Sequence, residues 1–222
     1  MAHYEETTEL VPITPGKLNK SDKQLAIRRA EAGAADYVPH LSIDQVRSIA
    51  NAATGRHAER DRLLIMLLFD GCLRCSEALG TRPCDLERAG AGWLVKIVGK
   101  GSKPGVAAIS ATLAAELQAY AYRQGIPPDA RLFPITRPRA FQIVTKAFSR
   151  AGISRPSRAR DKVGSVHILR HSGAIERLRQ TGNPKALQDQ LRHKSARMTL
   201  RYLKTLSSDE SLEIQQEVDF NW

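Results

Sequence analysis

The chain has 222 residues with a hydrophobic content of 42%, which suits one sizeable core and is little for two full domains. Its longest wholly apolar run, residues 63–69, is too short to span a bilayer, and its acidic, polar start does not resemble a secretory signal. Three cysteines are too few for a secreted disulfide scaffold, so we expect a cytoplasmic protein in a reducing compartment that has no membrane partner.

The net charge of +11 conceals a stronger contrast along the chain. Residues 37–206 carry 29 Lys and Arg residues against 12 Asp and Glu residues, whereas residues 207–222 carry five acids and no base. Clustered cations gain affinity for nucleic acid by neutralising phosphates and releasing counterions. Aromatic residues are only 5% and are not interleaved with the basic ones, so we expect a groove for double-stranded DNA rather than a stacking surface. Charge alone also fits a merely soluble basic protein.

The N-terminal part of the chain shows helical periodicity. Residues 1–36 are predicted to form an arm with one basic helix at residues 17–35, and the main domain occupies residues 37–206. Ser42 and Gln45 have the spacing of a capping box, in which each side chain bonds the backbone N–H of the other residue. A helix is therefore predicted to start at Ser42.

The pattern changes to a hairpin between residues 93 and 109. The segment WLVKIV is rich in strand-forming residues, GKGSKPG is a turn that projects Lys100 and Lys103, and VAAI follows. We therefore expect a mostly α fold with a small antiparallel β-sheet (α+β). Further helices are predicted over residues 58–69, 110–122, 138–151, 167–180, 184–191 and 196–203, with a short one from Cys75.

The stretch at residues 149–164 has no regular period and is strongly basic. It directly precedes the HILRH segment, and we expect a flexible loop whose cations bind DNA phosphates. The cations assigned to DNA binding are Arg155, Arg158, Arg160 and Lys162.

Four separated segments carry side chains suited to phosphate chemistry. Each is weak alone, because an isolated arginine is more often an ion-paired surface residue and a hairpin lysine is usually just solvated. The segments are LRCSE at 73–77, GKGSK at 99–103, HILRH at 167–171 and LRHKSARMTLRYL at 191–203.

The histidines and cysteines of these segments also suggest a metal, which we weigh against the residues around them. His167 and His171 are four residues apart, as in a helical metal pair, but the HExxH mechanism needs a Glu beside the first His. Arg170 lies between them, repels a cation and favours a phosphate. Cys72 and Cys75 form a single CxxC without a second pair, which indicates core or helix-flank residues. We therefore expect no metal and no other cofactor.

Taken in order, the four segments resemble the catalytic motifs of the tyrosine recombinase or phage integrase family, which read approximately GLRxSE, GKGxK, HxLRH and LGHxxxxxTxxYxH. The resemblance covers residues 41–203, and its most specific feature is the nine-residue step from His193 to Tyr202 with Thr199 between them. It implies the catalytic-domain fold of that family. It also implies a metal-independent enzyme that breaks and rejoins DNA in the recombination or integration of mobile elements.

The resemblance assigns a phosphate-binding role to three side chains. Arg74 and Arg170 would offer paired donors to the non-bridging oxygens of the pentacoordinate phosphorane, and His193 would add a hydrogen bond. Glu77, one helical turn after Arg74, is expected to orient that arginine. His171 is expected to support Arg170 or the phosphate.

The remaining assignments concern bond making and proton transfer. Tyr202 would attack the phosphate and form a 3′-phosphotyrosyl intermediate that keeps the bond energy for religation. His167 would accept the hydroxyl proton, and a hairpin lysine would protonate the departing 5′ oxygen. The distance to the following strand favours Lys100 over Lys103 for that role, and both remain candidates.

The chain departs from the family pattern in several places. GCLR has one residue more than GLR, Arg192 stands where glycine is usual, and Leu203 follows Tyr202 without the frequent later histidine. About forty residues precede the catalytic region, too few for the core-binding domain that members commonly carry. The expected partners are double-stranded DNA, further copies of the chain on that DNA, and accessory recombination proteins.

Two interpretations of the acidic tail at residues 207–222 remain open. Solvated disorder is one interpretation of the tail, and docking on a basic catalytic domain, in trans or in cis, is the other, because Phe220 and Trp222 are costly to leave in water.

The alternatives to recombination are relaxation of DNA by a type IB topoisomerase-like mechanism and a non-catalytic DNA-binding regulator. A metal-dependent nuclease would instead lose activity with a chelator.

Overall fold

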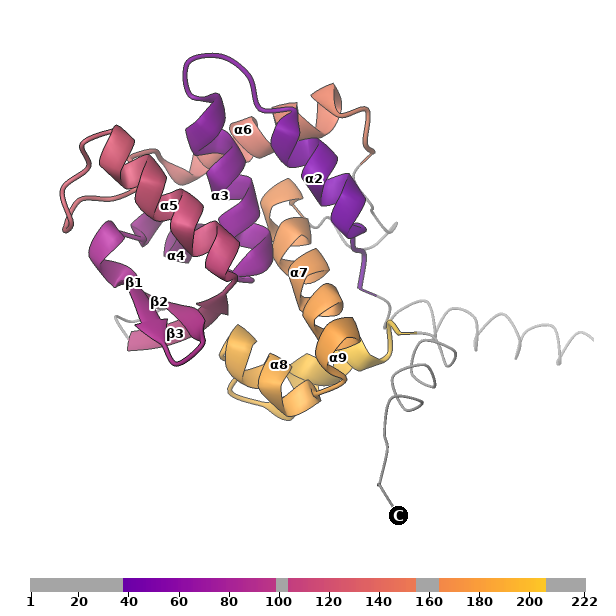
Figure 1. Ribbon diagram of the computed structural model, residues 1–222. Helices are drawn as coiled ribbons and strands as arrows, with labels where there is room; N and C mark the ends of the chain where they lie inside the picture. Colours follow the sequence, from indigo (N-terminus) through magenta and orange to yellow (C-terminus); the bar gives the residue numbers. More distant parts are fainter. Residues whose placement is uncertain (1–37, 99–103, 155–163, 207–222) are drawn as a thin grey trace, which may run out of the picture. The chain divides into compact units, whose positions relative to one another are not determined.

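Helices α3 and α7 pack against each other, and the remaining helices and a small sheet surround them (Figure 1). The computed structural model describes residues 38–98, 104–154 and 164–206. These residues form the predicted α+β fold, which is confirmed. The helices are α2 (Ile43–Asn51), α3 (Ala58–Asp70), α4 (Cys75–Gly80), α5 (Ala111–Arg123), α6 (Arg137–Arg150), α7 (Ser165–Thr181), α8 (Pro184–Leu191) and α9 (Ala196–Leu203), with a 3₁₀ turn η1 (Pro83–Asp85).

Polar side chains define where several helices begin. The predicted capping box is confirmed, because Ser42 Oγ accepts from the Gln45 N–H at 3.2 Å and Gln45 Oε1 accepts from the Ser42 N–H at 3.0 Å. Ser110 caps α5 and Asn183 caps α8 in the same way, by accepting a backbone hydrogen bond in the first turn. The helix boundaries therefore agree closely with those predicted from local patterns.

The sheet contains strands β1 (Leu86–Ala89), β2 (Gly92–Val98) and β3 (Pro104–Ile109) in the order β1-β2-β3, all antiparallel. The predicted hairpin of β2 and β3 is confirmed, with pairs running from Trp93 opposite Ile109 to Val98 opposite Pro104, the pair nearest the turn. Strand β1 was not predicted. Its sequence LERA buries only Leu86, so it carries no alternating pattern, and it forms because β2 offers a free edge.

The core has two parts, which include residues from the N-terminal and the C-terminal half of α7 respectively. The larger part packs α7 against α3, where a Cβ on Gly173 would overlap the Phe69 carbonyl, so that glycine allows the close approach of the two helices. The smaller part joins α7 to α8 and α9 and includes Cys72 and Tyr202. As predicted, Cys72 is a core residue and Cys75 is partly buried at the start of α4. The nucleophile candidate is thus built into packed structure.

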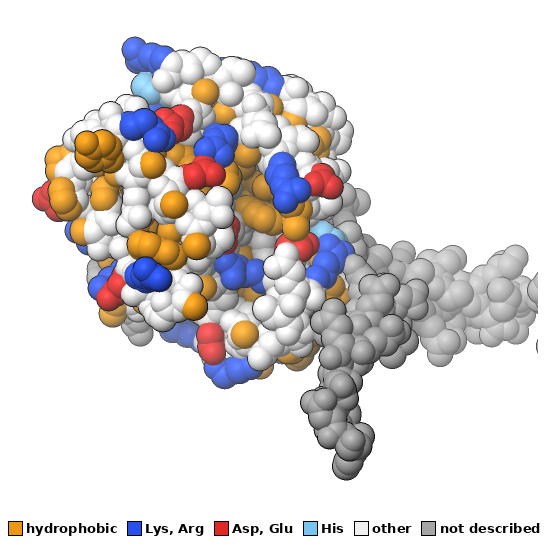
Figure 2. All heavy atoms as spheres, viewed as in Figure 1, with side chains coloured by type: hydrophobic (Ala, Val, Ile, Leu, Met, Phe, Trp, Pro, Cys, Tyr) orange, Lys and Arg blue, Asp and Glu red, His pale blue; other side chains and the backbone are white. Residues whose placement is uncertain are grey.

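Several predictions fall on segments outside the described residues. These are the N-terminal arm at residues 1–36, the hairpin turn with Lys100 and Lys103, the basic loop with Arg155, Arg158, Arg160 and Lys162, and the acidic tail at residues 207–222. On the face seen in Figure 2, Lys and Arg side chains are scattered among acidic ones rather than gathered in one patch. Within the described segments, no helix is long and apolar enough to cross a membrane.

Candidate active site

A cavity of about 170 Å³ brings together side chains from three of the four sequence motifs. The chain contributes the residue before α4, two turns of α7, the loop between α8 and α9, and α9 itself. Glu77 lies behind the cavity, and the candidate lysines belong to the turn outside the described residues. The lining residues are Val38, Arg74, His167, Arg170, His171, His193, Met198, Arg201 and Tyr202.

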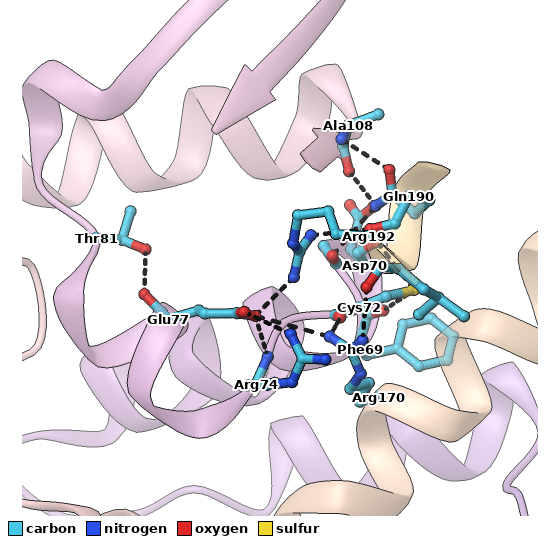
Figure 3. A network of polar contacts seen from close by, with 12 residues as sticks. Phe69, Asp70, Cys72, Arg74, Glu77, Thr81, Ala108, Arg170, Gln190 and Arg192 are labelled. Carbon is cyan, nitrogen blue, oxygen red and sulfur yellow. Dashed lines mark hydrogen bonds and ion pairs between the residues drawn. The ribbon is translucent and has the colours of Figure 1, made fainter. Parts of the chain in front are cut away.

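Glu77 accepts two hydrogen bonds from Arg74 (Figure 3). Arg74 is the N-cap residue of α4, and its backbone N–H donates to Glu77 Oε2 at 2.7 Å while its Nη1 donates to Oε1 at 2.9 Å. The carboxylate side chain is 2% exposed, whereas the Arg74 side chain is 41% exposed. The carboxylate therefore anchors one end of a guanidinium whose other end is open to a ligand.

Arg170 is buried and binds the protein itself. Its Nη1 donates to the Cys72 carbonyl and its Nη2 donates to the Leu191 carbonyl at 3.0 Å, and Nη1 lies 3.7 Å from Glu77 Oε2. Burial, followed by the charge of Arg74, lowers its pKa to about 10. A guanidinium has five N–H donors, so others remain for a phosphate at the cavity floor. Arg170 thus ties the residues after α3 to the end of α8.

Tyr202 makes its hydrogen bond with a different histidine from the one expected. Its hydroxyl lies 2.8 Å from His171 Nδ1, whereas no contact with His167 is found among the described residues. The structure thus pairs the Tyr202 hydroxyl with His171, and the role of His167 as proton acceptor stays a prediction. His171 lies one helical turn beyond His167 on α7, and that extra turn brings it to α9. The two imidazole rings meet edge to face, with centroids 4.9 Å apart.

The surroundings of the cavity shift the pKa values of the tyrosine and the imidazoles toward their uncharged forms. It raises the pKa of Tyr202 to about 12, and together with neighbouring positive charges it lowers that of His171 to about 3 and that of His193 to about 4. The pKa of His167 is lowered for the same reasons, burial first and Arg170 second. At neutral pH the cavity therefore combines charged guanidiniums with neutral imidazoles that can accept a proton.

His193 contacts two side chains of α9. Its Nδ1 lies 3.0 Å from the Thr199 hydroxyl, and its ring stacks near Tyr202 with centroids 6.2 Å apart. Thr199 is buried in α9, one helical turn before Tyr202. His193, Thr199 and Tyr202, which the sequence analysis selected in the LRHKSARMTLRYL segment, thus lie next to one another, with His193 between the other two.

Two arginines at or near the cavity received no role from the sequence. Arg201 lines the cavity from α9, and Arg192 donates to Glu77 Oε2 at 2.7 Å (Figure 3). The departure from glycine at Arg192 was the only local sign. Within the described parts of the chain, no group of three His, Cys, Asp or Glu side chains is placed to hold a metal ion.

Comparison with known proteins finds similar chains of one family. The model of the phage integrase family matches residues 39–208. Tyrosine recombinase XerC of Myxococcus xanthus is 28% identical over 210 residues, which are 90% of this chain and 66% of the relative. Tyrosine recombinase XerC of Methylobacterium sp. (strain 4-46) is 36% identical over 159 residues, 67% of this chain and 47% of the relative. The chain thus spans about half to two thirds of these relatives' length.

Solved structures show the same fold. The catalytic domain of bacteriophage HP1 integrase has a TM-score of 0.61 at 22% identity, covering 83% of this chain and 95% of that one. XerH site-specific recombinase bound to its difH substrate has a TM-score of 0.63 at 21% identity, covering 82% of this chain and 53% of that one. The helices and the small sheet therefore have the arrangement of such catalytic domains.

Proposed function

The chain belongs to the phage integrase family, and on that premise we propose that it cleaves and rejoins double-stranded DNA through a covalent bond between Tyr202 and a DNA phosphate. One observation carries the proposal. The hydroxyl of Tyr202, the guanidiniums of Arg74 and Arg170 and three imidazoles converge on one small cavity from distant parts of the chain. A protein that only binds DNA does not need a buried nucleophile at that point.

The charges around the cavity suit an attack on a phosphodiester. In the first step, the Tyr202 oxygen forms a bond to phosphorus and the bond from phosphorus to the 5′ oxygen breaks, which leaves a 3′-phosphotyrosine and a 5′ hydroxyl. Arg74 and Arg170 stabilise the additional negative charge of the phosphorane, and His193 donates a hydrogen bond to it. The reverse attack by a 5′ hydroxyl restores the DNA backbone without ATP.

The proton of Tyr202 needs an acceptor, because burial raises the pKa of the tyrosine to about 12. We assign this role to His171, whose neutral Nδ1 lies 2.8 Å from the hydroxyl. The ring of His167 is next to that of His171 and is the second candidate. A lysine of the hairpin turn, Lys100 or Lys103, protonates the departing 5′ oxygen.

The partners follow from the same proposal. The similar XerH structure holds its difH substrate, and a lambda integrase structure with a TM-score of 0.58 is a dimer bound to a core site. We propose that this chain likewise acts on double-stranded DNA as an assembly of several copies in the cytoplasm, with accessory proteins, in recombination of the kind that moves mobile elements.

The test uses labelled nicked duplexes with a randomised centre. Cleavage beside the nick releases a short fragment that diffuses away, so the DNA cannot be rejoined and the covalent adduct accumulates. Wild-type protein should give a covalent protein–DNA band on a denaturing gel, in excess EDTA as well as without it. Tyr202→Phe should bind the same DNA and give no band, because only the nucleophilic hydroxyl is lost. Absence of the wild-type band would favour a non-catalytic regulator. Loss of the band in EDTA with recovery in magnesium would favour a nuclease.

A further experiment separates recombination from DNA relaxation. The sequence of the trapped DNA supplies the site, which is then placed twice in one plasmid. Exchange between the two copies should follow if the chain is a recombinase. Relaxation of supercoiled plasmid without any exchange would indicate a topoisomerase-like activity.

A further inference from the structure

Arg192 has a backbone conformation that is costly for its side chain. It follows α8 with φ 56° and ψ 42°, in the left-handed region, which glycine adopts readily at this place after a helix. Among the described residues other than glycine, only Cys72 shares a positive φ. An arginine in this conformation needs contacts that offset the strain.

The side chain of Arg192 makes such contacts with three different segments, and those with Glu77 and Gln190 are drawn in Figure 3. Its Nη2 donates to Glu77 Oε2 at 2.7 Å, and its Nη1 donates to the Gln190 carbonyl at 2.8 Å. Its stem lies against Gly105 in β3, where an added Cβ would be 2.9 Å from Arg192 Cδ. The side chain therefore connects the segment before His193 with α4 and with the strand that follows the hairpin turn.

Glu77 is the point at which Arg192 meets the phosphate-binding arginines. Its Oε2 accepts from the backbone of Arg74 and from Arg192, its Oε1 accepts from the side chain of Arg74, and Arg170 lies 3.7 Å away. Burial alone would raise the pKa of this carboxyl, but the Arg74 hydrogen bond and the Arg192 charge lower it overall. The carboxylate is held on both oxygens, so its plane is fixed.

The fold does not depend on Arg192 to neutralise Glu77. Arg74 and Arg170 already supply two positive charges to the buried carboxylate, and glycine at position 192 would adopt the left-handed turn with no strain. The third arginine therefore has an effect other than neutralisation. It restricts the rotation of the carboxylate that aims Arg74, and it does so from the residue next to His193.

We propose that Arg192 is a positioning residue of the strand-cleavage site: through Glu77 it sets the direction of Arg74, and through Gly105 it keeps the His193 segment in register with strand β3. The inference rests on the proposed DNA cleavage. Arg192 touches no reacting atom, so its effect is expected on the rate of the chemical step rather than on DNA binding.

The first experiment measures single-turnover adduct formation at saturating DNA. Arg192→Gly should slow it about tenfold while the Kd for DNA changes by less than about threefold, because the aim of Arg74 is lost and its charge is kept. Arg197→Ala is the matched control, since it removes one exposed arginine from the neighbouring α9. An unchanged rate in Arg192→Gly, or an equal loss in the control, would overturn the proposal.

A double-mutant cycle tests the contact with β3. Gly105→Ala should slow cleavage in the wild-type background, because the new Cβ displaces the Arg192 stem, and should have little effect in the Arg192→Gly background. Equal effects in both backgrounds would show that Gly105 acts independently of Arg192 and would contradict the coupling. Circular dichroism of each variant confirms that the rates refer to folded protein.

A binding measurement separates this inference from the proposed function. Inorganic phosphate is titrated into the DNA-free protein, and the ring protons of His167, His171 and His193 are followed by NMR. Arg192→Gly should weaken phosphate binding several-fold more than Arg197→Ala does. If wild type forms no adduct but this difference is found, the cleavage proposal fails and the positioning by Arg192 stands. Equal phosphate affinity in both variants would overturn the positioning role whether or not DNA is cut.

Discussion

The hydroxyl of Tyr202 lies 2.8 Å from Nδ1 of His171, and this hydrogen bond joins α9 to the central helix α7. Tyr202 is buried and His171 is partly buried, and burial lowers the pKa of His171 to about 3 and raises that of Tyr202 to about 12. The pair is therefore neutral at physiological pH. The proton of the phenol can therefore pass to the imidazole only when the phenol oxygen forms a bond to a phosphorus atom in the same step.

The first prediction compares the two histidines of HILRH. His171→Ala should slow adduct formation about a hundredfold, because the group bonded to the nucleophile is lost. His167→Ala should slow it less, about tenfold, since its ring reaches Tyr202 only through His171. Single-turnover rates on the trapping duplex decide between them. A larger loss in His167→Ala would return the acceptor role to His167 and show that DNA binding rearranges the histidines.

The second prediction concerns stability in acid. The pKa values of His171, about 3, and His193, about 4, are below the 6.5 of an ordinary histidine, so the unfolded chain binds more protons than the folded one below pH 6.5. Their contribution to stability is present above pH 6.5 and is lost as the pH falls. For His171, about 2–3 kcal/mol of unfolding free energy should disappear between pH 6.5 and pH 4.

Urea unfolding at a series of pH values checks this loss. His171→Gln should flatten the dependence on pH, because its side chain does not titrate. His57→Gln serves as the comparison, since His57 is exposed and its pKa is lowered mainly by the charge of Arg60 rather than by burial, so its substitution should change the slope less than His171→Gln does. The same steep slope in His171→Gln as in wild type would contradict the burial of a neutral imidazole.

The third prediction separates the two arginines. Arg74→Ala and Arg170→Ala should each reduce cleavage by about 10²–10³-fold, since each removes a donor to the transition state. Only Arg170→Ala should also destabilise the protein, by about 3 kcal/mol, because it leaves the Cys72 and Leu191 carbonyls without their donor. Denaturant midpoints measured beside the rates test the difference. Equal stability losses in the two variants would be inconsistent with the partners that the structure gives them.

The fourth prediction addresses the leaving group. One of the two lysines, Lys100 or Lys103, protonates the 5′ oxygen. Changing that lysine to Ala should reduce the rate of cleavage by about 10²–10⁴-fold. A duplex with sulfur in place of that bridging oxygen should restore the rate, because a thiolate leaves without a proton. We expect this rescue for Lys100→Ala and a small effect for Lys103→Ala. Rescue of Lys103→Ala alone would reverse the assignment.

The fifth prediction concerns the basic loop. Changing Arg155, Arg158 and Arg160 together to Ala should reduce the slope of log affinity against log salt by about three, near one for each phosphate that is no longer neutralised. Fluorescence anisotropy with duplex DNA over a range of salt concentrations measures the slope. Arg123→Ala, on α5 and paired with Glu59, is the control for removal of one charge elsewhere. An unchanged slope in the triple variant would place the DNA on other cations.

The sequence by itself determined the helices, the hairpin, the family and most of the side chains that line the cavity. Helical spacing, capping residues such as Ser42 and the step from His193 to Tyr202 are local properties, and local patterns determine which segments form helices and which residue types they carry. Strand β1 was not predicted, because its residues form a strand only beside β2.

Only the tertiary structure decided which of these side chains meet. His171 rather than His167 reaches Tyr202 because the packing of α9 on α7 sets which helical turn faces the hydroxyl. Arg170 binds the Cys72 and Leu191 carbonyls because the C-terminal ends of α3 and α8, far apart in the chain, lie close to each other in the fold. The contact of Arg192 with Glu77 depends on a left-handed turn that its own side chain does not favour. Such pairings arise from helix packing and long-range contacts, and neither leaves a periodic signal in the sequence.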